Sequence, residues 1–162
     1  MEEFTEGAPT SADSDSDKYI TFSLDDEEYG VEVLKVHEII GYRQFTKVPN
    51  VPPFVKGALN LRGLVVPVVD LRLKLNMEPR QYDSVTVVLI MEVQQQIVGI
   101  VVDAVSEVVT LNNEDMQQTP DFTSGVQVDF IKGVGRKDGQ LLIILDIDRV
   151  LSSRELELLD IA

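Results

Sequence analysis

The clearest pattern in the chain lies between residues 55 and 70, where two apolar segments flank a two-residue turn. Residues 55–61 and 64–69 are rich in Val and Leu, and Arg62-Gly63 separates them. Glycine adopts positive φ without strain, as tight hairpin turns require. Apolar runs of this length, bounded by turn residues, are typical of strands. The pattern therefore predicts a β-hairpin whose apolar faces must be covered by other parts of the chain.

The same pattern returns in the second half of the chain, shifted so that Gly133 takes the place of Gly57 and Gly139 that of Gly63. A second match, at a slightly smaller shift, aligns Gly30 with Gly99 and Glu38 with Glu107. We interpret four of these glycines as structural turn positions, namely Gly57, Gly63, Gly133 and Gly139. Two related halves, each with about five strand signals, are typical of a duplicated small β-barrel.

The strand signals divide the chain into a first barrel over residues 19–77 and a second over residues 85–151, with a boundary near Glu78. The nearly unbroken apolar run at 85–91 suits a strand that is buried on both sides, between the barrels. The predicted fold class is all-β with short helices, in which two pseudo-duplicated five-stranded β-barrels pack on a shared apolar core.

Two further signals refine this picture. Pro67 cannot donate a backbone hydrogen bond, so the strand that contains it is expected to lie at an edge or a bulge there. Ser152 and Glu155 have the spacing of a capping box, which predicts a C-terminal helix over residues 152–162.

Charge and composition narrow the class of partner. The stretch 1–17 carries six acidic side chains and no basic one, which predicts a disordered acidic tail. The rest has 14 basic against 22 acidic side chains, so it repels nucleic acid and anionic lipid. The chain has no cysteine, no leader-like start and no apolar run of membrane-spanning length. We therefore expect a cytoplasmic protein, without membrane insertion, whose partners are proteins or small molecules.

Residues 81–131 contain eight acidic side chains and no Lys or Arg. A solvated acidic face is the ordinary interpretation of such a stretch. The alternative is a docking surface for a basic partner.

Catalytic and metal-binding patterns are not found. The glycine-rich stretch 57–63 lacks the order of a phosphate loop, there is no serine elbow, and His37 is the only histidine. His37 has no acid at helical metal spacing, so a partly exposed strand histidine is favoured over a ligand or a base. We expect no enzymatic activity, no metal and no cofactor. A small-ligand-binding β-barrel and an unrecognised hydrolase stay open as alternatives.

Several motifs occur together in this chain, namely the stretches 57–63 (GALNLRG), 26–30 (DEEYG) and 98–103 (VGIVVD), with Pro67 and Asp70-Leu71. They resemble the motifs of one family, the CheW proteins of bacterial chemotaxis, and the resemblance runs from about residue 19 to 151. It implies two SH3-like five-stranded barrels and a non-enzymatic adaptor of two-component signalling. Such an adaptor links the histidine kinase CheA to the cytoplasmic tips of methyl-accepting chemoreceptors. No kinase or receiver domain accompanies these motifs, so a free-standing coupling protein at receptor arrays is expected.

By the same resemblance, receptor-binding positions fall near the groove between the barrels, at Val36, Glu38, Arg62, Val87, Gly99 and Val108. Kinase contacts are expected at the hairpin-turn ends of both barrels, without assigned residues. Glu38 and Arg62 have the repeat counterparts Glu107 and Asp138, so only one barrel is expected to form an ion pair there.

Overall fold

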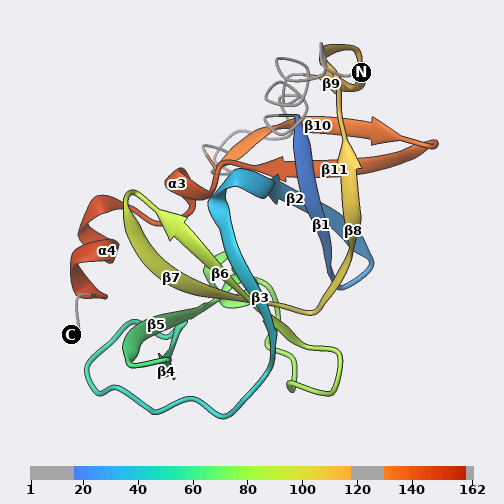
Figure 1. Ribbon diagram of the computed structural model, residues 1–162. Helices are drawn as coiled ribbons and strands as arrows, with labels where there is room; N and C mark the ends of the chain where they lie inside the picture. The colour runs from blue at the N-terminus through green and yellow to red at the C-terminus, as the bar shows by residue number, and fades with distance from the viewer. Residues whose placement is uncertain (1–16, 118–129, 160–162) are drawn as a thin grey trace, which may run out of the picture.

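The computed structural model describes residues 17–117 and 130–159, which form two β-sheets and several short helices (Figure 1). One sheet has six strands in the order β8-β1-β2-β11-β10-β9, and the other has five in the order β3-β6-β7-β5-β4. The first contains β1 (Lys18–Leu24), β2 (Glu27–Glu32), β8 (Ala104–Thr110), β9 (Met116–Gln117), β10 (Ile131–Lys137) and β11 (Gln140–Leu145). The second contains β3 (Val36–Gly41), β4 (Val55–Leu61), β5 (Leu64–Asp70), β6 (Val87–Val93) and β7 (Gln96–Val102). The helices are η1 (Val33–Lys35), α2 (Leu71–Lys74), η2 (Asn113–Asp115), α3 (Ile147–Val150) and α4 (Ser153–Leu158).

Each sheet closes on itself, because the chain that leaves one edge strand returns to pair with the opposite edge. After β3, Thr46 pairs with Ala58 of β4, and its backbone N–H donates to the Ala58 carbonyl oxygen at 2.8 Å. After β8, β9 pairs with β10 in the same way, with Gln117 opposite Val134. The two sheets are therefore small barrels, which we call the six-stranded barrel and the five-stranded barrel.

The repeated glycines have two different roles. Gly63 and Gly139 occupy hairpin turns with φ of 91° and 79°, which confirms the positive φ predicted for them. Turns are also predicted at Gly57 and Gly133, but these residues lie inside β4 and β10, beside bulges. A Cβ on either would fall under 3.0 Å from a carbonyl oxygen of the closing segment. Gly57 and Gly133 thus allow close approach of backbone and do not reverse the chain.

The strand register confirms the internal duplication. β11 runs parallel to β2 with Ile144 opposite Gly30, and β5 runs parallel to β7 with Val68 opposite Gly99. The two shifts found in the sequence relate these pairs, since one aligns Gly30 with Gly99 and the other aligns Val68 with Ile144. The two halves therefore share the register of their parallel strand pairs as well as the strands themselves.

The pairing corrects the predicted division into barrels over residues 19–77 and 85–151. The β1–β2 hairpin joins β8, β10 and β11, whereas the β6–β7 hairpin joins β3, β4 and β5. The two halves have exchanged their first hairpins, so each barrel contains strands of both. β1 and β6 have the same pattern of buried and half-buried positions, so the apolar pattern alone fits either assignment.

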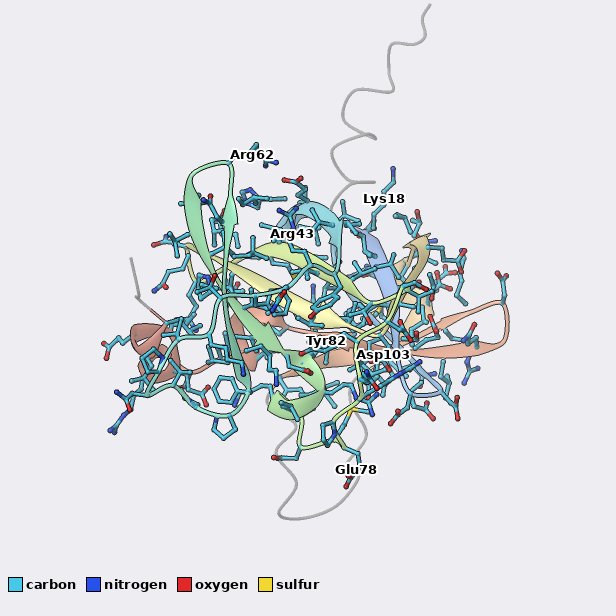
Figure 2. The ribbon with its side chains drawn as sticks, turned by 90° about the horizontal axis from the view of Figure 1, so that it is seen from below. Lys18, Arg43, Arg62, Glu78, Tyr82 and Asp103 are labelled. Carbon is cyan, nitrogen blue, oxygen red and sulfur yellow. The ribbon has the colours of Figure 1, made fainter. Side chains whose placement is uncertain are left out.

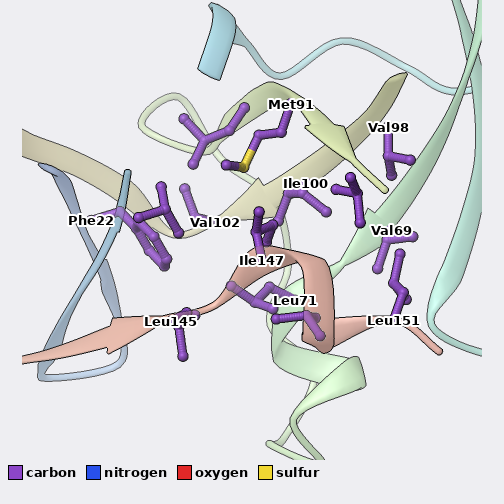
Figure 3. Packing of buried hydrophobic residues seen from close by; sticks show 14 of the residues in the cluster. Phe22, Val69, Leu71, Met91, Val98, Ile100, Val102, Leu145, Ile147 and Leu151 are labelled. Carbon is purple, nitrogen blue, oxygen red and sulfur yellow. The ribbon is translucent and has the colours of Figure 1, made fainter. Parts of the chain in front are cut away.

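The main cluster of buried apolar side chains lies between the barrels and is built by both (Figure 3). Phe22 and Leu145 come from the six-stranded barrel and Ile100 from the five-stranded barrel, and each is at most 1% exposed. Ile147 of α3 and Leu156 of α4 complete the cluster. Because burial of apolar surface is the main favourable term in folding, this shared core, as predicted, holds the barrels together.

The C-terminal helix forms over residues 153–158, with Ser152 and Glu155 in the predicted capping box. Residues 160–162 of that prediction, and 1–16 of the predicted tail, lie outside the described residues.

Pro67 lies on β5, which is an inner strand of its sheet and not an edge strand. The pairing of β5 with β7 begins at Val68, so the N–H that Pro67 lacks is not needed for that pairing. None of the helices in the described ranges is long and apolar enough to cross a membrane.

Candidate protein-binding site

The tip of the β4–β5 hairpin presents a charged side chain on an unfavourable backbone conformation. Arg62 has a φ of 52°, and the equivalent Asp138 has a φ of 53°. Aspartate tolerates this left-handed region better than arginine does. Strained positions of this kind concentrate at functional sites. The Arg62 side chain is 71% exposed and stands at an extremity of the molecule (Figure 2), where a partner can reach it.

Arg62 forms a two-pronged ion pair with Glu38 of β3. Its Nη2 donates to Glu38 Oε1 at 2.5 Å, and its Nη1 donates to Oε2 at 3.3 Å. The hydrogen bond from Arg62 lowers the pKa of Glu38, and the nearby charge of Arg43 acts in the same direction. The counterparts Glu107 and Asp138 are both acids. Only the five-stranded barrel forms this pair, as predicted.

The sequence around this pair has a charge opposite to that of the whole chain. Residues 39–69 contain four basic side chains and no acidic one, although the net charge of the protein is −14. Opposite charges steer association and suppress wrong partners. This part of the five-stranded barrel therefore suits an acidic partner segment.

Val36 and Val87 lie on the neighbouring strands β3 and β6, and both pack partly against the shared core. They are at opposite ends of the pairing, because Val36 is opposite Met91 while Gly41 is opposite Val87. A bulge follows Val36, so it packs on the shared core, whereas Ile40 packs inside the five-stranded barrel. Val36 and Ile40 therefore lie on different faces of β3, although strict alternation along a strand would put them on one face.

Gly99 and Val108 differ most from the other predicted positions. Gly99 is buried on β7, where a Cβ would lie 3.0 Å from Val88 Cγ1, so a partner cannot touch it directly. Val108 is 57% exposed on β8 and is the one residue of the six that belongs to the six-stranded barrel. The structure thus joins Glu38 and Arg62 directly and leaves Val108 as a separate exposed position on the other barrel.

A buried polar centre at Arg72 escapes the sequence analysis. The side chains of Arg72 and Asp103 are each 6% exposed and meet at 2.8 Å. Arg72 also donates to Asp25 Oδ1 and to the Glu78 carbonyl oxygen, both at 2.8 Å. Arg72 is preceded and followed by leucines in a short helix, a setting in which an arginine is ordinarily exposed. Nothing in the local pattern signals its burial.

The described residues show little that would serve a small ligand or a metal. The interior of the five-stranded barrel is filled by a cluster that includes Val66, Val68 and Val88, each 0% exposed. No group of three or more metal-binding side chains occurs within residues 17–117 and 130–159. His37 is 49% exposed and lies 3.2 Å from Glu92 Oε1. The predicted acidic docking surface over 81–131 falls partly outside the described residues and stays a prediction.

Known proteins share both the sequence and this architecture. A model of the CheW-like domain family matches residues 18–155. The chain belongs to the CheW-like family. It is 43% identical over 143 residues to the chemotaxis protein CheW of Klebsiella aerogenes, which covers 88% of this chain and 86% of that protein. It is 36% identical over 138 residues to the CheW of Rhizobium meliloti, with coverage of 85% and 89%.

A solved structure of the CheW family agrees with the fold. The crystal structure of the scaffolding protein TtCheW from Thermoanaerobacter tengcongensis matches with a TM-score of 0.79 and 30% sequence identity. The match covers 86% of this chain and 95% of that one. These findings confirm the predicted family and the mostly β architecture of two SH3-like barrels. They also support a scaffolding role in chemotaxis.

Proposed function

We propose that this CheW-like protein is a non-enzymatic adaptor that couples the cytoplasmic tips of chemoreceptors to the histidine kinase CheA. The observation that carries the proposal is the exposed Arg62–Glu38 pair, on a chain that resembles a scaffolding protein over most of its length. An exposed charge that an ion pair already holds in place suits docking, because it needs little reorganisation to meet a partner. The protein would act in the cytoplasm, at receptor arrays, through protein contacts alone.

On the receptor side, the proposed surface uses Val36, Glu38, Arg62, Val87, Gly99 and Val108. Arg62 and Val108 are exposed and would touch the receptor directly. Gly99 would act indirectly, because a larger residue there would push on Val88 and Ile90 inside the barrel.

On the kinase side, the proposal uses the hairpin-turn ends of both barrels. Three apolar side chains next to the two turns are exposed, Leu64 by 51%, Val65 by 46% and Leu141 by 57%. Val65 and Leu141 are equivalent positions of the repeat. Leu64 and Val65 adjoin the β4–β5 turn and Leu141 adjoins the β10–β11 turn, so each hairpin-turn end offers exposed apolar surface to a protein partner. Val65→Glu and Leu141→Glu are therefore expected to weaken binding of CheA in a pull-down.

Charge reversal at Arg62 tests the receptor side. Arg62→Glu places a second acid beside Glu38, and co-sedimentation with receptor signalling fragments should fall strongly while the melting temperature changes little. Lys56→Glu is the matched control, since it makes the same change of charge at an exposed site of the same barrel. Adding Glu38→Arg to Arg62→Glu should restore part of the binding. Undiminished binding by Arg62→Glu would remove Arg62 from the docking surface.

A further inference from the structure

Between the described strands, the chain passes from one barrel to the other at two points. The first crossing joins β2 to β3 through the short helix η1, and the second joins β7 to β8 at Asp103. The connection from β5 to β6 stays within the five-stranded barrel. The backbone therefore controls how the barrels sit on each other only through these two crossings.

Each crossing is held by an ion pair to a short helix, and the two pairs have opposite polarity. Arg72 of α2 binds Asp103 of one crossing at 2.8 Å, and we call this pair the Arg72 clamp. Asp148 of α3 binds Lys35 of the other crossing at 2.9 Å, and we call this pair the Lys35 clamp. Arg72 and Asp148 are equivalent positions of the repeat. The helix side of the two clamps is thus equivalent in the repeat with its charge reversed, whereas their partners Asp103 and Lys35 are not equivalent positions.

Both clamps also reach the tip of an exchanged hairpin. Arg72 donates to Asp25, at the β1–β2 turn, at 2.8 Å. Asp148 Oδ1 accepts from the backbone N–H of Gln94, at the β6–β7 turn, at 2.8 Å. Each clamp therefore joins one helix, one crossing and one hairpin tip.

The clamps differ in burial. Both side chains of the Arg72 clamp are 6% exposed, and Asp103 also binds Arg80 at 3.1 Å. The side chains of the Lys35 clamp are 32% and 35% exposed. Helix η1 has no buried residue, and its Leu34 is 62% exposed. Opening a buried pair leaves uncompensated charge in the interior, whereas water and salt readily replace a half-exposed one.

We propose that the Lys35 clamp is releasable and the Arg72 clamp is not. When closed, the Lys35 clamp positions the start of β3, which carries Val36 and Glu38. When it opens, η1 and the start of β3 gain freedom without disturbing the shared core. Lys35 and Asp148 are thus positioning residues for the surface on β3. The consequence for receptor binding rests on the proposed function, whereas the unequal opening of the two clamps does not.

Amide hydrogen exchange on the full chain tests the unequal opening. Lys35→Gln removes one charge, and Asp148→Asn removes the other while keeping an oxygen for the Gln94 N–H. Either variant should speed exchange at residues 33–38 by about two- to five-fold, the range expected for a half-exposed ion pair. The double variant should match the single ones, Lys35→Arg should match the parent, and residues 103–107 should not change. Equal acceleration at both crossings, additive effects, or no acceleration would overturn the proposal.

A second measurement separates this proposal from the proposed function. Receptor fragments should bind Lys35→Gln about two- to five-fold more weakly than the parent, and about 1 M NaCl should reduce that difference by screening the clamp that only the parent has. If Lys35→Gln opens the crossing but binds like the parent while Arg62→Glu fails to bind, the positioning role is wrong and the docking surface stands. If the parent itself does not bind receptor fragments, the proposed function is wrong, and the unequal opening of the two clamps still stands or falls on the exchange data.

Discussion

Replacing Gly57 with alanine tests the closure of the five-stranded barrel. The new Cβ would fall well under 3.0 Å from the Thr46 carbonyl oxygen, a backbone atom that cannot swing aside. Thr46 and Ala58 exchange two backbone hydrogen bonds of 2.8 Å, and displacing Thr46 would break both. Two hydrogen bonds at about 1 kcal/mol each, with about 1 kcal/mol for a non-glycine residue at a φ of 137°, give a loss of about 3 kcal/mol.

Gly63→Ala is the matched control, because its φ is 91° but no atom lies within 4 Å of the added Cβ. Backbone strain alone should cost about 1 kcal/mol there. The free energy of unfolding of a small protein falls by about 2 kcal/mol per molar urea. The urea concentration at the unfolding midpoint should therefore fall by about 1.5 M for Gly57→Ala and about 0.5 M for Gly63→Ala. Equal shifts, or an Ala58 amide that stays as protected as in the parent, would refute the argument.

Three further predictions follow from side chains already in contact. Arg72→Met should lower the free energy of unfolding in urea by about 3 kcal/mol, because it removes the buried cation beside Asp103 and leaves that carboxylate with only the half-exposed Arg80; adding Asp103→Asn should recover part of the loss. Gln94 and Gln95 both have positive φ, and only Gln94 uses its side chain, which donates to carbonyl oxygens at the end of α3. Gln95→Gly should therefore stabilise by about 0.5 kcal/mol, and Gln94→Gly should destabilise. The lowered pKa of Glu38 means that its ion pair is fully formed above pH 4.5 and is lost as the pH falls through the lower folded pKa. An NMR titration of its carboxyl carbon should move toward 4.5 in Arg62→Ala, and an unchanged midpoint would exclude the pair in solution.

The sequence predicts the local elements and the duplication because both depend on spacing. Apolar runs and turn residues predict hairpins such as β4–β5 and the positive φ of Gly63. The two shifts of the repeat predict the ion pair of Glu38 with Arg62. The assignment of each hairpin to a barrel does not follow from the sequence, because the β1–β2 and β6–β7 hairpins have equivalent patterns of apolar residues. Choosing between them requires contacts between distant residues, such as Arg72 with Asp25 and Asp103.

In the candidate site, too, some features can be predicted from the sequence and others cannot. The ion pair of Glu38 and Arg62 is predictable, since charge and repeat position suffice to propose it. The burial of Gly99 is not, because it depends on the Val88 side chain of the neighbouring strand. The different packing of Val36 and Ile40 is also missed, because the bulge on β3 arises from its pairing with β6.

The exchange of hairpins also bears on folding during synthesis. The strands of the five-stranded barrel lie between residues 36 and 102, so that barrel can close while the C-terminal part is still being made. The β1–β2 hairpin is made first, but its β2 edge must wait for β11, where Tyr29 pairs with Ile143. Until then β2 presents an open edge, which invites pairing with other chains. If translation stalls before β11 is made, the β1–β2 hairpin, which is synthesised first, should therefore be the part most exposed to aggregation.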